Sequence, residues 1–193
     1  HYVFPGGATE PYIEAMIEGA TGMGIRFHAG RGSMTRGRAN GGVVPDQACQ
    51  TVDEVVRHSL ELIEKYHDPS PSSQIRIDLA PCGVHTDEPE LFREFAKIAA
   101  DNPGVGLHTH LYEVIDTKYC EETYGVTPWR FLGKNGWHDS RVWLAHMVDP
   151  PEGEIPEFAE TNVGIVHLVA ADLRMGFGLA PLRKYLDAGC KVG

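Results

Sequence analysis

Ile75-Arg76-Ile77-Asp78-Leu79-Ala80 is a short apolar run, and Val105-Gly106-Leu107-His108-Thr109-His110 is a second one. Between them, the segment Glu88 to Ala100 carries apolar residues at helical spacing. A strand, a helix and a second strand in this order predict a parallel βαβ unit, because parallel strands need a long crossover connection.

The same alternation extends in both directions from this stretch. Thr51 to Tyr66 has helical periodicity and begins with a capping box made by Thr51 and Glu54. Gly189 is expected to end the last helix. The further strands are predicted at 25–29, 142–146, 164–168 and from 190 onward, and the further helices lie within 111–135, at 152–161 and at 179–188.

Repeated βα units predict an α/β fold that is part of a (β/α)8 barrel. A complete barrel typically needs about 250 residues, so the 193 residues here supply about five to six units. An open doubly wound sheet is the alternative, although the chain has no G-x-G-x-x-G turn. In a barrel, the long loop Gly30 to Gln50 would lie on the catalytic face.

Both ends of the sequence suggest that residues 1–193 are an internal fragment of a barrel domain, incomplete at both ends. The chain opens on the apolar run His1-Tyr2-Val3-Phe4-Pro5 and closes on what reads as the start of a strand. The alternative is a processed or tagged terminus.

Charge and composition exclude several classes of function. The formal net charge is −10, which argues against nucleic acid and anionic membranes as partners. No apolar run reaches the ~20 residues of a spanning helix, and no signal peptide opens the chain. The four cysteines form no C-x-x-C pair, so we expect reduced thiols and a cytoplasmic protein.

Histidines gather at the predicted strand ends, namely His28, His108, His110, His146 and His167. The carboxyl ends of barrel strands converge on one site. A neutral imidazole is a common zinc ligand, and a Glu three residues later could move the proton of an activated water. We therefore favour His110 as the metal ligand and Glu113 as the proton shuttle, the alternative being a His that caps the strand and a Glu on the next helix.

Four other residues have both a functional and a structural interpretation. His146 could position a hydroxide or an oxyanion, or it could be a core histidine; Asp149 could orient it, but its Pro-Pro neighbours favour a turn cap. Arg31 could bind a ring carbonyl or an anionic heterocycle, or form an ordinary salt bridge. Cys82 has no neighbouring base, so we interpret it as pocket wall.

These motifs together resemble a known family. His108-Thr109-His110-Leu111-Tyr112-Glu113, Val142-Trp143-Leu144-Ala145-His146 and Arg174-Met175-Gly176-Phe177-Gly178 are similar to the aminohydrolases of the amidohydrolase superfamily. The stretches 27–34, 79–82 and His1-Tyr2-Val3-Phe4-Pro5 resemble the group of 8-oxoguanine deaminase and hydroxydechloroatrazine ethylaminohydrolase. The resemblance covers essentially the whole chain.

The resemblance implies a barrel of the amidohydrolase type and an enzyme of purine or triazine metabolism. One divalent metal, zinc or alternatively iron, would be held in part by His110. A metal-activated hydroxide would attack the amino-bearing ring carbon of an 8-oxoguanine-like purine or a hydroxytriazine, with Glu113 as proton shuttle and His146 positioning the hydroxide. Arg31, Cys82, Asp172 and Arg174 would contact the substrate.

The chain also departs from the family pattern. The H-x-H pair of the first strand and the Asp of the last strands are missing, and His167-Leu168-Val169-Ala170-Ala171-Asp172 stands where the family has His-Cys-Pro-x-Ser-Asn. One histidine cannot hold catalytic zinc, so we expect the fragment alone to be inactive and to aggregate or stay molten. The alternatives are a guanine or pterin deaminase, or a metal-free relic acting as a binding or scaffold domain. The full-length protein could be a homo-oligomer.

Overall fold

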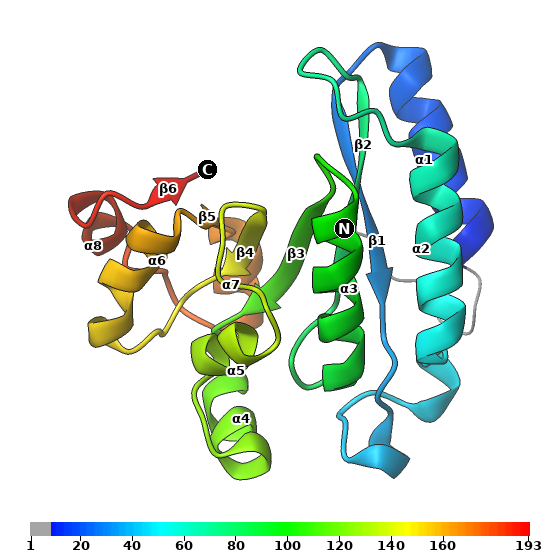
Figure 1. Ribbon diagram of the computed structural model, residues 1–193. Helices are drawn as coiled ribbons and strands as arrows, with labels where there is room; N and C mark the ends of the chain where they lie inside the picture. The colour runs from blue at the N-terminus through cyan, green and yellow to red at the C-terminus, as the bar shows by residue number, and fades with distance from the viewer. Residues whose placement is uncertain (1–8) are drawn as a thin grey trace. The chain divides into compact units, whose positions relative to one another are not determined.

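The computed structural model describes residues 9–193 (Figure 1). The resemblance expected at His1-Tyr2-Val3-Phe4-Pro5 lies outside these residues. The chain divides into two compact units, and the boundary between them falls after His108.

The first unit alternates helices and strands as expected. Its elements are α1 (Thr9–Met23), β1 (Phe27–Ser33), the 3-10 turns η2 (Arg38–Asn40) and η3 (Asp46–Ala48), α2 (Val52–Tyr66), β2 (Ile75–Pro81), α3 (Pro89–Asp101) and the first half of β3 (Gly106–Leu111). Both strand pairings, β1 with β2 and β2 with β3, are parallel. Helices α2 and α3 pack against β2 and against each other (Figure 1), and the predicted capping box at Thr51 is confirmed.

Strand β1 differs from its prediction. The sequence predicted a strand at 25–29 followed by a loop from Gly30, whereas the strand runs from Phe27 to Ser33. Its second half pairs in register with the second half of β2, from Gly30↔Asp78 to Ser33↔Pro81. Gly-rich segments have little intrinsic strand preference. Pairing with β2 therefore determines how far this strand extends.

Gly106 allows a close approach between β2 and β3. The backbone N–H of Gly106 donates to Asp78 Oδ1 at 3.1 Å, and Asp78 is fully buried. A Cβ at position 106 would lie 2.5 Å from that oxygen. A side chain here would therefore displace the carboxylate that fixes the start of β3.

The second unit contains the end of β3 and three further strands. Its elements are α4 (Asp116–Tyr124), α5 (Pro128–Lys134), β4 (Val142–His146), the 3-10 turn η4 (Glu152–Glu154), α6 (Ile155–Thr161), β5 (Gly164–Val166), α7 (Val169–Met175), α8 (Leu182–Asp187) and β6 (Lys191–Val192). Strands β4, β5 and β6 pair in that order, all parallel. Large buried residues form its core, namely Leu111, Trp129, Leu132, Trp137, Leu144, Phe158 and Tyr185.

Helix α7 was not predicted. The sequence predicted a strand through Leu168, but β5 ends at Val166 and the chain turns into a helix at Val169. The run Leu168-Val169-Ala170-Ala171 is apolar enough for either state, and so short a run cannot be assigned by periodicity. Gly189 has φ of 84°, as expected for the glycine that ends α8.

Within residues 9–193, no helix has both the length and the apolar character needed to cross a bilayer.

Candidate active site

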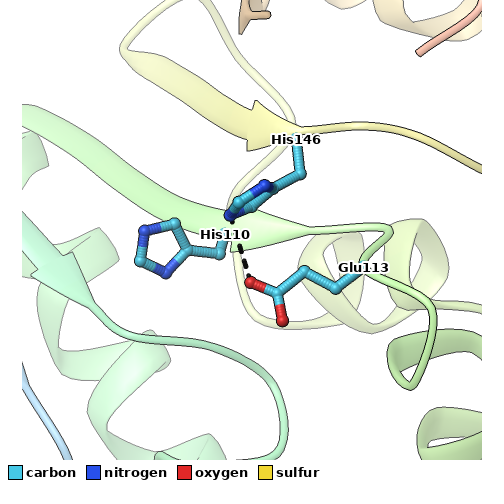
Figure 2. A group of neighbouring side chains, drawn as sticks. All are labelled: His110, Glu113 and His146. Atoms are coloured by element: carbon cyan, nitrogen blue, oxygen red, sulfur yellow. Dashed lines mark ion pairs between the residues drawn. The ribbon is translucent and has the colours of Figure 1, made fainter. Parts of the chain in front are cut away.

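Three of the predicted residues meet in the second unit. His110 lies near the end of β3, Glu113 in the following loop, and His146 at the end of β4. Figure 2 shows the three side chains close together, with the dashed line between His146 and Glu113. Their potential ligand atoms all lie within 4.8 Å of one another, so the expected convergence of strand ends occurs here.

The backbone around these residues is held in an uncommon conformation. Tyr112, His146 and Met147 have φ of 55°, 71° and 52°, values that cost a non-glycine residue on the order of 1 kcal/mol or more. Two hydrogen bonds join the strand ends, from Met147 N–H to the Leu111 carbonyl at 2.9 Å and from Val148 N–H to the Tyr112 carbonyl at 3.1 Å. These bonds hold β3 and β4 together where both catalytic candidates emerge.

Tyr112 anchors the turn that carries Glu113. Its side chain is fully buried; its hydroxyl donates to Glu154 and accepts the Trp129 N–H at 3.3 Å. Burial first, and then the bond to Glu154, raise the pKa of Tyr112, so the hydroxyl stays a donor. The backbone N–H of Glu113 in turn donates to Asp116 Oδ2 at 3.0 Å, which fixes the other side of the turn.

His146 uses both ring nitrogens. Nε2 lies 3.2 Å from Glu113 Oε1, and Nδ1 lies 2.5 Å from Asp172 Oδ1. Burial alone would lower the pKa of His146, but the hydrogen bonds to Glu113 and Asp172 outweigh it and raise this pKa. The ring also contacts Phe177 edge-to-face at 5.7 Å between centroids and lies 5.2 Å from the ring of His110.

This donor set suits a divalent transition metal in part. Two imidazoles and one carboxylate are ligand types that zinc and iron accept. A catalytic zinc site takes about three protein ligands and one open position. Because the Glu113 carboxylate is paired with His146, the two histidines are the groups left for a metal. A complete site would therefore need further ligands from other parts of a barrel.

The other predicted histidines have different surroundings. His28 is the second residue of β1, so the expectation that it lies at the carboxyl end of a strand is wrong. Its Nδ1 lies 3.0 Å from Asp78 Oδ2, which is a pairing inside the first unit. His108 is buried and belongs to the first unit, and His167 directly follows the end of β5.

Arg31 lies in β1 of the first unit, in surroundings that indicate a structural role. Its side chain is fully buried, and the guanidinium donates to Gly32 O at 2.8 Å, Gln50 Oε1 at 3.0 Å and His58 Nδ1 at 3.3 Å. These three acceptors are uncharged groups, and the alternative of an ordinary salt bridge stays a prediction. Contact with a substrate stays a prediction.

Cys82 directly follows β2 in the first unit, and its backbone is one of several hydrogen-bond donors to the carboxylate of Asp87. Its backbone N–H donates to Asp87 Oδ2 at 2.9 Å, and the hydroxyls of Ser33 and Thr86 donate to the same carboxylate at 2.9 and 3.0 Å. Complete burial raises the pKa of Asp87 to about 7, and these donors offset that effect only in part. The predicted role of Cys82 as pocket wall is untested.

Asp172 and Arg174 both lie on α7 but differ in solvent exposure. Asp172 is fully buried against His146, whereas Arg174 is exposed. The residue that contacts His146 is thus Asp172 and not Asp149, which is exposed. No local pattern connects His146 with a carboxylate 26 positions later, so the sequence alone could not identify this pair.

Comparison with known proteins gives one family. The model of the amidohydrolase family matches residues 3–193. The 8-oxoguanine deaminase of Pseudomonas aeruginosa is 34% identical over the whole chain, and an isoxanthopterin deaminase from an unknown prokaryotic organism is 33% identical, also over the whole chain. The chain covers 43% and 40% of these two relatives.

Solved structures agree with this grouping. The crystal structure of a mutant of atrazine chlorohydrolase TrzN from Arthrobacter aurescens TC1, complexed with zinc and atraton, matches 100% of this chain with a TM-score of 0.95 and 56% identity. Another TrzN structure, complexed with zinc, matches 94% of the chain with a TM-score of 0.91 and 58% identity. This chain spans 42% and 40% of those chains. The predicted fold, an α/β part of an amidohydrolase barrel, is confirmed.

Proposed function

Since the chain belongs to the amidohydrolase family, we propose that it carries part of the active site of a metal-dependent hydrolase that replaces a leaving group on a ring carbon of a nitrogen heterocycle. The observation that carries this proposal is the convergence of His110, Glu113 and His146 within 4.8 Å. Because the chain spans about two fifths of its relatives, we propose that flanking segments of the full-length protein complete the barrel and the ligand set.

His110 is the proposed metal ligand of this chain, and His146 faces the same point through Nε2. A divalent metal at this point would supply a hydroxide nucleophile near neutral pH by lowering the pKa of a coordinated water. The zinc in both TrzN structures supports zinc as the metal.

Glu113 is the proposed proton carrier. Its side chain is half-buried and its backbone is fixed by Asp116, so the carboxylate can take a proton at the nucleophile and deliver it to a ring nitrogen or to the leaving group. Its position beside His146 Nε2 supports this role, because a protonated Glu113 can donate a hydrogen bond to Nε2 and so hold the proton between transfers.

His146 is the proposed positioning group for the nucleophile. Its Nε2 is directed at the same region as Glu113, while Nδ1 is occupied by Asp172. One ring nitrogen is thus held by Asp172, and the other, Nε2, lies beside Glu113 on the side of the reacting atoms.

The leaving group divides the proposal into two candidates. The TrzN structures, at 56–58% identity and named for a chlorohydrolase, favour displacement of chloride from a triazine. The deaminases, at 33–34% identity, favour displacement of ammonia or an amine, the reaction that the sequence motifs suggested. An amine leaves only after it gains a proton, whereas chloride leaves as a stable anion. The amine reaction therefore depends more on Glu113.

The test is turnover by the full-length zinc-loaded protein of chloro- and aminotriazines, 8-oxoguanine and isoxanthopterin, with chloride and ammonia measured separately. We expect Glu113→Gln to lower kcat by about 10²–10⁴-fold for an amine substrate while zinc content stays unchanged. The matched control is Glu122→Gln, on the exposed face of α4, where a weak ion pair to Lys118 is lost. Near-normal turnover by Glu113→Gln would refute the shuttle role, and no turnover of any heterocycle by the wild type would refute the proposed function.

A further inference from the structure

Asp172 is placed as a partner of His146 by the fold of α7. The carboxylate Oδ1 lies 2.5 Å from His146 Nδ1, and the aspartate side chain is fully buried. Its backbone is fixed on both sides, since its N–H donates to the Leu168 carbonyl at 2.9 Å and its carbonyl accepts the Phe177 N–H at 2.9 Å. The same turn brings the Phe177 ring edge-to-face against His146.

Fold stability does not by itself explain why a carboxylate is buried here. A buried ion pair is weak evidence for stability, because both groups lose their hydration. Asp172 Oδ2 is also buried and finds no hydrogen-bond partner among residues 9–193, which adds an uncompensated cost. A carboxylate kept in such a place is better explained by what it does to the imidazole.

The geometry fixes which nitrogen of His146 can react. A carboxylate accepts hydrogen bonds only, so Asp172 holds the proton on Nδ1. Nε2, on the far side of the ring, faces Glu113 at 3.2 Å. The hydrogen bond at one ring nitrogen sets the state of the other.

We propose that Asp172 is a positioning residue, which holds the His146 imidazole in the orientation and tautomer that direct Nε2 at the reacting atoms. This inference deepens the proposed function and replaces the substrate contact that the sequence suggested for Asp172. Phe177 restricts rotation of the ring from another side, and α7 therefore serves as the support of His146.

The test uses the full-length protein with ¹⁵N-labelled histidine, in the variants Asp172→Asn and Asp172→Ala. Long-range ¹H–¹⁵N NMR spectra, assigned with His146→Gln, report which nitrogen of His146 carries the proton. We expect the neutral imidazole of His146 to be the Nδ1–H tautomer alone in the wild type and a mixture of both tautomers in Asp172→Ala. Loss of the partner that orients a metal-ligating histidine typically costs about 10–100-fold, and for His146 we expect a loss of similar size in kcat, with KM changed less than about threefold.

The matched control is Asp187→Asn, which removes the same charge from an exposed ion pair with Arg183 on α8. It should change neither the NMR signal of His146 nor kcat. If Asp172→Ala does not fold, the isosteric Asp172→Asn carries the test.

Two results would overturn the proposal. One is an unchanged Nδ1–H form of His146 in both Asp172 variants, and the other is a raised KM with normal kcat, which would make Asp172 a substrate contact. The NMR readout needs no substrate, so it separates failure of this proposal from failure of the proposed function.

Discussion

Glu154→Ala is predicted to destabilise the second unit and to weaken catalysis together. Glu154 is buried in η4 and accepts hydrogen bonds from the hydroxyls of Tyr112 and Thr127, the latter at 2.6 Å. Tyr112 stands directly before Glu113, in a backbone conformation that requires support. Loss of the carboxylate therefore leaves a buried hydroxyl without its acceptor and loosens the turn that carries the proton shuttle.

The magnitude follows from these contacts. A hydrogen bond from the buried Tyr112 hydroxyl to a charged acceptor is worth about 1.5–3 kcal/mol, and the half-buried Thr127 bond about 1 kcal/mol. We expect the free energy of unfolding to fall by about 2.5–4 kcal/mol. Combining Glu154→Ala with Tyr112→Phe should show a coupling of about 2 kcal/mol, because both changes remove the same bond.

The assay is urea unfolding of the full-length protein, followed by kcat measured under conditions where the variant is folded. The control is Glu152→Ala, two residues away, whose exposed pair with Lys184 should contribute almost nothing. Equal stability of the two variants would refute the reasoning, as would a coupling energy near zero between Tyr112 and Glu154.

Two further predictions concern the first unit. Asp87→Asn should flatten the pH dependence of stability, because the raised pKa of about 7 means that the protonated wild-type carboxyl favours folding below about pH 4 and loses this contribution as the pH rises to about 7. The urea midpoint of the wild type should therefore fall between pH 5 and 7.5, whereas that of Asp87→Asn should not. A parallel fall in both proteins would contradict this prediction, and Asp101→Asn, at the exposed end of α3, is the control. Arg31→Lys should lower the free energy of unfolding by about 2 kcal/mol, because an ammonium group cannot form the same hydrogen bonds to three fixed acceptors. The control, Arg57→Lys on the exposed face of α2, should have almost no effect. Normal stability with a raised KM for Arg31→Lys would favour the substrate contact instead.

Periodicity and strand-end chemistry made the central elements predictable. Strands β2, β3 and β4 and helices α2 and α3 lie close to where the sequence placed them, because long amphipathic segments and apolar runs bounded by turns are governed by local pattern. His110, Glu113 and His146 were predictable for a related reason, since parallel strands bring their carboxyl ends together.

The Gly-rich part of β1 and the short helix α7 were not predictable from local pattern. Gly30 to Ser33 becomes a strand only because β2 offers a partner in register, and the apolar residues from Val169 onward could form either a strand or a helix. The prediction placed His28 near the carboxyl end of its strand because it ended that strand at residue 29, whereas β1 runs from Phe27 to Ser33.

By itself, the sequence determined the order of the βα units and the three side chains at the strand ends, because both depend on short-range patterns of polarity. The tertiary structure alone decided partners such as Asp172 for His146, Glu154 for Tyr112, and Gln50 and His58 for Arg31. A hydrogen bond between residues distant in the chain depends on how buried elements pack, and since a buried polar group is costly until it finds its partner, packing selects that partner.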